Sequence, residues 1–361
     1  MPTNSFTDIT VSASVTVVPE HIHSIDQDID LYGGNLRQIE RLKKTIGFDQ
    51  RRIAPKEVTA LDLCHQASER LLSNLNLSAE ALDGIIFVTQ TPDHSQPSNA
   101  SLLHGLLGCQ KSCAALDIGL GCSGFVYGLW LAFSLINNGS SDKILVLTGD
   151  TLSRMVNPQD KATASLFGDG GSATLVQKQA GAGVSWFQLG SDGTGAEALK
   201  VPAGGARIPI SQATAKASTD TEGNIRTQED LFMDGASVFN FSIEVVPEAI
   251  KALLKVADLP LESLDYLVLH QANTYMVQNI GKRLGIDPAR LPIRSFGAFG
   301  NLSSASIPGA LAYELADELT DKKTSKPQKL IFSGFGVGLS WGSCLLPLEP
   351  LKCLEWLEYK Q

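Results

Sequence analysis

The 361-residue sequence is poor in positive charge: 29 lysine and arginine residues stand against 38 aspartates and glutamates, and the net charge is −9. A protein that binds nucleic acid needs a basic face for the phosphate backbone, so this balance argues against that class of function. The sequence also lacks a long hydrophobic run, because the apolar stretch 124–136 is shorter than the roughly 20 residues of a membrane-spanning helix. The polar start MPTNSFTDIT lacks the charged and apolar segments of a signal peptide.

The six cysteines form no CxxC pair and follow no regular spacing. In a chain of this size without an export signal, we expect free thiols in a reducing, cytoplasmic compartment. Cys109 and Cys113 could share a metal ion, but nothing nearby in the sequence supplies further ligands. We therefore expect neither a metal site nor a disulfide framework.

What the sequence does contain is an internal repeat. The segment 82–93 (LDGIIFVTQTPD) begins with an acidic residue and a strand-like apolar run, and 264–275 (LDYLVLHQANTY) repeats that beginning. An amphipathic helical stretch precedes each segment. A helix, a strand, a glycine-flanked polar corner and a second helix follow each one, the strand and corner of the second half being read from IRSFGAFGN. Apolar strands that start at Lys143 and Lys329 then close the two halves.

This alternation of strands and helices predicts an α/β fold with mixed, mostly parallel sheets. We expect two duplicated halves, 1–180 with the nucleophile and 181–361 with its partners. The helix at 124–136 is apolar on all sides, and its counterpart at 303–316 begins with small residues. Two such helices between two sheets would give a five-layer αβαβα body. The polar segment 203–230 is interpreted as a surface excursion or lid.

Three polar residues occupy strand ends within this repeat: Cys122, His270 and Asn301. Each alone has an ordinary structural explanation, as a packed thiol, a buried histidine or a turn residue. In α/β sheets, however, ligands collect at the carboxyl ends of strands, so all three could face one crevice. The start of a helix also favours a thiolate at Cys122. Together they predict a nucleophilic site.

The sequence resembles the β-ketoacyl-acyl-carrier-protein synthase III family of the thiolase superfamily. The resemblance extends from about residue 45 to the end of the chain, and its motifs keep the order and spacing of the family. Its motifs are GCSGFVYGL at Gly121, LFGDGGSATL at Leu166, MDGASVFNF at Met233, HQAN at His270, and GNLSSASIP with GFGVGLSWG near the end.

The resemblance implies a thiolase-like fold, a tight homodimer and a Cys122–His270–Asn301 triad. It implies acyl transfer from a thioester of coenzyme A or of an acyl carrier protein to Cys122. Decarboxylative condensation with a malonyl thioester would follow, with His270 and Asn301 binding its carbonyl oxygen. The backbone N–H groups of Cys122 and Val337 would form the oxyanion hole. No cofactor is implied beyond the phosphopantetheine arm of the substrates.

The sequence departs from the family pattern at positions that contact coenzyme A or the carrier. Arg41 stands where many relatives have a tryptophan, and Thr45 stands where they have an arginine. Tyr275 and Lys161 replace two further arginines, and Gln96 replaces an aromatic residue supplied by the dimer mate. These changes put stacking on adenine, and acetyl-coenzyme A as the primer, in doubt. A longer acyl chain delivered by a carrier protein is the alternative.

Two other functions remain open at this point. The same acyl-cysteine could serve an acyltransferase or a synthase of specialised metabolites of the quinolone, resorcinol or cyclohexanedione type. The chain could also be a non-catalytic partner subunit, although such a subunit has no reason to keep all three triad positions. A true thiolase is disfavoured because GFGVGLS contains no second cysteine.

Overall fold

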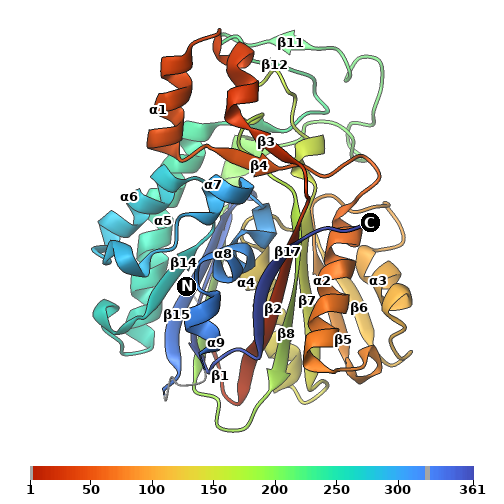
Figure 1. Cartoon of the computed structure of the whole chain (residues 1–361), viewed down its shortest axis with the longest axis vertical. Helices are drawn as coiled ribbons and strands as arrows, with labels where there is room; N and C mark the ends of the chain where they lie inside the picture. Colours follow the sequence, from red (N-terminus) through yellow and green to blue (C-terminus); the bar gives the residue numbers. More distant parts are fainter. Residues whose placement is uncertain (1–2, 322–325) are drawn as a thin grey trace.

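Two β-sheets form the framework of the protein in the computed structural model, which describes residues 3–321 and 326–361 (Figure 1). The six-stranded sheet has the order β17 (Cys353–Glu358), β2 (Ile9–Val18), β8 (Gly170–Lys178), β7 (Lys143–Asp150), β5 (Gly84–Val88), β6 (Ala114–Ile118). The five-stranded sheet has the order β1 (Thr3–Phe6), β9 (Ser185–Ser191), β16 (Ser340–Leu348), β15 (Gln328–Gly336), β14 (Tyr266–Leu269).

Helices cover both outer faces of these sheets and fill the space between them (Figure 1). The central layer holds α4 (Gly124–Asn137) and α8 (Ser306–Glu314), whose apolar residues share one core cluster with both sheets. The outer layers hold α2 (Ala60–Leu75) and α3 (Asn99–Leu107) on the six-stranded sheet, and α5 (Gly235–Val256) and α6 (Thr274–Leu284) on the five-stranded sheet. The five-layer αβαβα prediction is confirmed.

Shorter elements connect these layers and cover one end of the molecule. The remaining helices are α1 (Leu36–Ile46), α7 (Ser295–Phe299) and α9 (Ala316–Thr320). The short strand pairs are β3 (Ile22–Ser24) with β4 (Gln50–Arg52), β10 (Leu199–Lys200) with β13 (Phe232–Met233), and β11 (Ser218–Thr219) with β12 (Ile225–Arg226). The 3-10 helices include η1 (Ile25–Tyr32) and η7 (Ser303–Ala305). No helix in the described part of the chain has the length and apolarity to cross a membrane.

Helix α4 lies unusually close to the strands beneath it. A Cβ atom added at Gly124 would lie 2.3 Å from Cγ1 of Val88 in β5, and one at Gly128 would lie 2.9 Å from Cγ1 of Val146 in β7. These two glycines therefore let the helix backbone rest directly on the sheet. Further along the helix, the ring of Phe133 packs against the rings of Phe6 in β1 and Phe187 in β9, so two strands of the five-stranded sheet contact the same side chain.

Two sequence-based expectations about strands are corrected by the structure. The six-stranded sheet is mixed as expected, with parallel pairs β17/β2, β7/β5 and β5/β6. Among the described strands of the five-stranded sheet, only β14 and β15 are parallel. A short turn at 337–339 folds β16 straight back along β15, which makes that pair antiparallel. The pairs β16/β9 and β1/β9 are also antiparallel. The expectation of mostly parallel sheets is thus wrong for this sheet.

The strand expected around Ile293 does not form either. The backbone N–H groups of Ile293 and Arg294 donate to the carboxylate of Glu314, and the Pro292 carbonyl accepts from Nε2 of Gln271. Pro292 itself has no N–H to give to a neighbouring strand. Side chains therefore satisfy the backbone here, and the short helix α7 follows.

The division into 1–180 and 181–361 stays a prediction. Each sheet also takes one strand from the other end of the chain, because β1 pairs with β9 and β17 pairs with β2. The predicted excursion 203–230 lies at the end of the molecule, where β11 and β12 are found (Figure 1).

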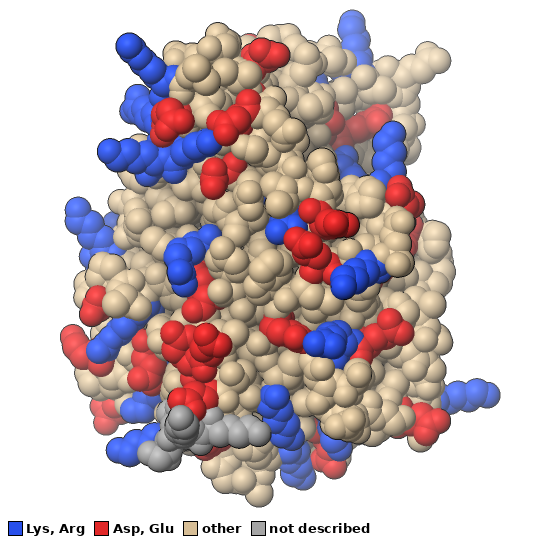
Figure 2. All heavy atoms as spheres, in the orientation of Figure 1, with Lys and Arg blue, Asp and Glu red and all other residues tan. Residues whose placement is uncertain are grey.

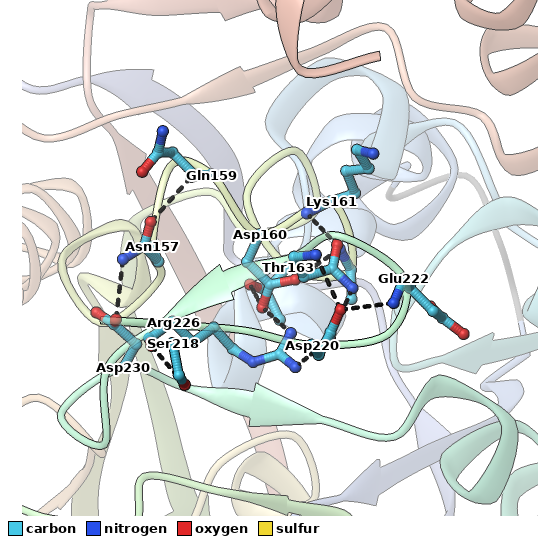
Figure 3. Close-up of polar contacts among 12 residues, drawn as sticks. Asn157, Gln159, Asp160, Lys161, Thr163, Ser218, Asp220, Glu222, Arg226 and Asp230 are labelled. Atoms are coloured by element: carbon cyan, nitrogen blue, oxygen red, sulfur yellow. Dashed lines mark hydrogen bonds and ion pairs between the residues drawn. The ribbon is translucent and has the colours of Figure 1, made fainter. Parts of the chain in front are cut away.

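Ion pairs and hydrogen bonds attach the segment 203–230 to the rest of the protein. Arg226 contacts the buried carboxylate of Asp160 at 3.0 Å and that of Asp220 at 2.6 Å (Figure 3). Asn224 accepts a hydrogen bond from the backbone N–H of Lys161 at 3.1 Å. A buried ion pair of this kind resists opening, because separating it would leave the Asp160 charge buried and unpaired.

We expect Phe133→Ala to lower the free energy of unfolding by about 3–5 kcal/mol, because it removes a fully buried ring from the core cluster that α4 forms with residues of both sheets. The measurement is denaturant unfolding followed by circular dichroism. Leu36→Ala in α1 is the control, since Leu36 is 66% exposed and should change stability by less than about 0.5 kcal/mol. Equal effects of the two substitutions would contradict the assignment of the core.

Candidate active site

One cavity of about 80 Å³ brings Cys122, His270 and Asn301 together. Its wall is apolar and includes Leu166, Phe167, Leu199, Val238, Met276 and Phe335. The cavity reaches the first residues of α5 and α6, where Gly235 is exposed and Asn273 is half-buried. The three polar residues predicted from the sequence thus face a common space with a route to the surface.

Cys122 lies in the turn that joins β6 to α4, and its side chain is buried. The end of β15 presses against it: a Cβ at Gly336 would lie 2.9 Å from its Sγ atom, and a Cβ at Gly334 would lie 2.6 Å from its carbonyl oxygen. The backbone N–H groups of Cys122 and of Val337, just after β15, contact the sulfur. Glycine at 334 and 336 is what allows this approach.

The protonation state of Cys122 differs from the expectation. Burial raises the pKa of the thiol to about 12, and the negative charge of Asp150 adds to the rise. The Ser303 hydroxyl and the two backbone N–H groups act in the opposite direction but do not outweigh burial. The position of Cys122 at the start of a helix favours a thiolate, as expected, but burial has the larger effect. In the resting structure Cys122 is a neutral thiol, because desolvation penalises the charged form more than the helix favours it.

His270 directly follows β14, and its backbone N–H donates to the Ser333 carbonyl at 2.8 Å. Its Nδ1 atom is 2.6 Å from Oγ of Ser306 in α8, and its ring meets the ring of Phe335 edge-on. Burial lowers the pKa of His270 to about 3, although a hydrogen bond to the Ser303 backbone raises it slightly. The imidazole is therefore neutral at pH 7.

Asn301 is held by backbone pairing on both sides. Its N–H donates to the Leu166 carbonyl at 3.0 Å, and its carbonyl accepts from Gly168 at 3.1 Å. A Cβ at Gly168 would lie 2.0 Å from the Phe299 carbonyl oxygen, so glycine is needed for this approach. The Asn301 Oδ1 atom accepts from the N–H of Ser303 at 2.9 Å. The Oδ1 acceptor is therefore occupied, and the Nδ2 group is the part of the carboxamide that is left to donate to a ligand.

Comparison with known proteins agrees with this geometry. Family models described as 3-oxoacyl-[acyl-carrier-protein] synthase III and its C-terminal part match residues 116–193 and 254–348. A beta-ketoacyl-[acyl-carrier-protein] synthase III of Caldanaerobacter subterraneus is 38% identical over 83% of this chain and 86% of its own length. One of Rhodopirellula baltica is 34% identical over 93% and 97%. The crystal structure of a 3-oxoacyl-(acyl-carrier protein) synthase from Burkholderia xenovorans matches 99% of both chains with 36% identity and a TM-score of 0.91.

The chain belongs to the β-ketoacyl-acyl-carrier-protein synthase III family. The members of this family are acyltransferases of the condensing type. Structures with lower identity, a polyketide priming ketosynthase at 24% and an OleA protein at 20%, share the fold.

The five residues at which the chain departs from the synthase III pattern lie outside the cavity. Arg41 and Thr45 are exposed neighbours on α1, where Thr45 Oγ1 donates to the Arg41 carbonyl at 2.7 Å, and both line a surface groove. Tyr275, in the first turn of α6, is 46% exposed. Its ring stacks on the ring of Phe239 in α5, with 5.6 Å between the ring centroids. The end of α1 contacts this turn, because a Cβ at Gly47 would overlap Thr274.

Lys161 and Gln96 are also exposed. The Lys161 side chain points away from the Asp160–Arg226 cluster (Figure 3). Gln96 lies in the loop between β5 and α3. Two further cations of the chain lie in β4, shortly after α1, and both are paired with carboxylates. Arg51 contacts Asp28 at 2.8 Å, and Arg52 contacts Glu358 at 2.7 Å. They are structural contacts rather than free phosphate ligands.

Sequence reasoning missed three residues behind the nucleophile of this synthase III chain: Asp150, Ser303 and Gln90. Asp150 ends the apolar strand β7, and Gln90 comes two residues after β5. Their location at carboxyl ends of strands was the available signal, the same one that identified His270. Ser303 was concealed in a run of small residues that we interpreted only as helix packing.

We expect the His270 imidazole to stay neutral from pH 8 down to about 4.5, because burial lowers its pKa to about 3. The measurement is ¹⁵N-histidine NMR, with the signal assigned through His270→Asn. An unfolded histidine titrates near 6.5. The unfolded chain therefore binds more protons between these two values, and this residue lowers stability as the pH falls below about 6.5. Titration of the His270 signal near pH 6.5 in the folded protein would contradict the burial argument.

Proposed function

We propose that this synthase III family member transfers an acyl group from a thioester to Cys122 and then condenses it with a malonyl thioester, releasing carbon dioxide. The observation that carries the proposal is the convergence of one thiol, one neutral imidazole and one carboxamide on a single apolar cavity. Each of these groups suits one part of the reaction.

For acyl transfer, the sulfur of Cys122 attacks the thioester carbonyl and the carbonyl oxygen becomes negative. The backbone N–H groups of Cys122 and Val337 meet at the sulfur, which supports their assignment as the oxyanion hole. Such donors, fixed before the reaction, stabilise the developing charge without reorganisation. The departing phosphopantetheine thiol leaves along the route toward α5 and α6.

For condensation, the malonyl thioester loses carbon dioxide and its carbonyl oxygen becomes an enolate. The short contact with the Ser306 hydroxyl supports a tautomer in which Nδ1 of His270 accepts and Nε2 carries the proton. Nε2 of His270 and Nδ2 of Asn301 then donate to the enolate oxygen. The apolar ring of Phe335 beside His270 disfavours the malonyl carboxylate and favours its loss as neutral carbon dioxide. The enolate carbon attacks the acyl group on Cys122.

The carrier that delivers these thioesters is the second part of the proposal. Helix α1 presents Arg37, Arg41 and Lys44 as exposed cations, while Lys43 is paired with Asp26 at 2.7 Å. Lysine and arginine side chains project from this end of the molecule, with acidic side chains among them (Figure 2). Because α1 contacts the first turn of α6 beside the cavity mouth, a carrier with an acidic surface that docks on α1 would place its phosphopantetheine arm at the entrance.

We also propose that the chain forms a homodimer. The strand β6 is the outer strand of the six-stranded sheet, and most of its residues are only half-buried. An uncovered sheet edge invites pairing with a second copy. The loop with Gln96 ends at Asn99, whose backbone N–H donates to Asp117 of β6 at 2.8 Å, so this loop would then approach the partner.

We expect Cys122→Ala to abolish the acyl adduct that forms when the protein is mixed with acyl-coenzyme A or acyl-carrier donors, as read by intact-protein mass spectrometry. His270→Ala and Asn301→Ala should keep the adduct but lower carbon dioxide release from malonyl-carrier protein by about 10²–10³-fold, because each removes one enolate donor.

The donor panel also separates the alternatives. Transfer of the acyl group without carbon dioxide release would favour an acyltransferase that uses the same cysteine. No adduct from any donor would favour the non-catalytic subunit and overturn the proposal.

We expect Arg41→Glu to raise the KM for malonyl-carrier protein about tenfold, the equivalent of about 1.4 kcal/mol, and to leave kcat unchanged. The reason is that an exposed charge on α1 attracts the carrier but does not touch the reacting atoms. The measurement is steady-state kinetics at low and high salt, and the difference should shrink at high salt. Lys352→Glu, an exposed reversal outside α1, is the control. The same KM change in both variants would contradict docking on α1.

A further inference from the structure

A carboxylate lies behind the nucleophile that the proposed reaction does not yet use. Asp150, at the end of β7, is fully buried. Its Oδ1 atom accepts from the Gln90 backbone N–H at 2.7 Å and from Oγ1 of Thr89 at 3.2 Å, and its Oδ2 atom accepts from Oγ of Ser304 at 3.2 Å. All of these partners are neutral. Burying a carboxylate among neutral donors lowers the stability of the fold. Such a residue is therefore a candidate for a function in the reaction.

Ser303 connects this carboxylate to the thiol. Its hydroxyl lies close enough to interact with both the Asp150 carboxylate and the Cys122 sulfur, and Nε2 of Gln90 donates to its Oγ atom at 3.1 Å. A hydroxyl has one donor and two acceptor positions. The Gln90 bond takes one acceptor position. The O–H can then point to Asp150, while the second acceptor position receives the S–H of Cys122.

The backbone of Ser303 adopts a conformation that is unfavourable for a residue other than glycine. Its φ angle is 52°, in the left-handed region that residues other than glycine rarely adopt. The bond from its N–H to Oδ1 of Asn301 keeps it there. Gly121 makes room for Gln90, because a Cβ at that position would lie 2.5 Å from Nε2 of Gln90. Asn301 in the same segment and Gln90 in a distant one thus position the Ser303 side chain.

We propose that Ser303 passes the proton of the Cys122 thiol to Asp150 during acyl transfer and returns it when Cys122 is released. As the C–S bond forms, the S–H proton moves to Oγ of Ser303 and the Ser303 proton moves to the Asp150 carboxylate. The departing thiolate of the donor takes a proton from solvent. During condensation, the enolate carbon displaces the Cys122 sulfur, and the proton stored on Asp150 returns to it through Ser303. The proposal rests on the acyl transfer described above.

The chemistry of the two buried bases supports Asp150 over His270 as the acceptor. Burial raises the pKa of Asp150 to about 6, so it is ionised at pH 7 yet able to bind a proton, whereas burial lowers the pKa of His270 to about 3. A base with a pKa near the working pH is the better proton acceptor. Since the Cys122 pKa is about 12, the proton moves together with bond formation and no free thiolate accumulates.

The test is the rate of alkylation of Cys122 by iodoacetamide between pH 5 and 9, read peptide by peptide with mass spectrometry, and it needs no thioester. The relay predicts that Asp150→Asn and Ser303→Gly each slow the reaction by about 10²-fold at pH 7.5. It also predicts an inflection near pH 6 for the native chain, at the pKa of Asp150, that both variants lack. The other titratable groups facing this pair do not account for that inflection, because burial raises the pKa of the Cys64 thiol and lowers that of His270.

If the relay does not operate, the alkylation rate of Asp150→Asn changes in the opposite direction. If Asp150 acts on Cys122 through its charge alone, removing that charge lowers the thiol pKa, and Asp150→Asn reacts faster than the native chain. That outcome, or an unchanged rate in Ser303→Gly, overturns the relay. Glycine is chosen at 303 because it removes the hydroxyl and tolerates a φ angle of 52°, so folding is preserved.

Two controls complete the design. Ser68→Ala removes a buried hydroxyl that donates to the Cys64 carbonyl in α2 and should leave the rate unchanged. Acyl transfer from the donor panel is then measured in the same variants. A native chain that forms no adduct would refute the proposed function, whereas a native chain and Ser303→Gly that form it equally fast would refute only the relay.

Discussion

The close approach of β15 to the start of α4 is the constraint on which the site depends. Without a Cβ at Gly334 and Gly336, the strand backbone lies directly against Cys122. This contact buries the sulfur, directs the Val337 N–H at it, and places Phe335 against the His270 ring. A side chain at either glycine would push β15 away from Cys122, at the point where the reactive groups meet.

Burial then decides the electrostatics. The same enclosure that excludes water raises the pKa of Cys122 and lowers that of His270, so the resting site contains two neutral groups rather than an ion pair. A neutral imidazole is a good donor to a developing enolate, but a neutral thiol must lose a proton to react. The enclosed site therefore needs a proton acceptor, and Asp150 with Ser303 is placed to meet that need.

Much of the architecture could be predicted from the sequence, and the failures have local causes. The repeat indicated the two sheets and the central helices because apolar periodicity reports which faces are buried. It did not indicate that Glu314 and Gln271 satisfy the backbone near Ile293, since side chains distant in sequence do this. Nor did it indicate the antiparallel return of β16, which depends on a short turn.

By itself, the sequence determined the fold family, the order of most elements and the choice of Cys122, His270 and Asn301, because these depend on local pattern and on motifs. The strand end expected before Asn301 is the short helix α7 instead. Only the tertiary structure decided the protonation of Cys122, the partners of Arg51 and Arg52, and the link from Cys122 through Ser303 to Asp150. Those properties arise from distances and desolvation between segments that only the fold brings together, as for Ser304 and Asp150, which are 154 residues apart in the chain. The pattern of hydropathy along the chain predicts which residues are buried, but it does not predict which buried groups will share a cavity.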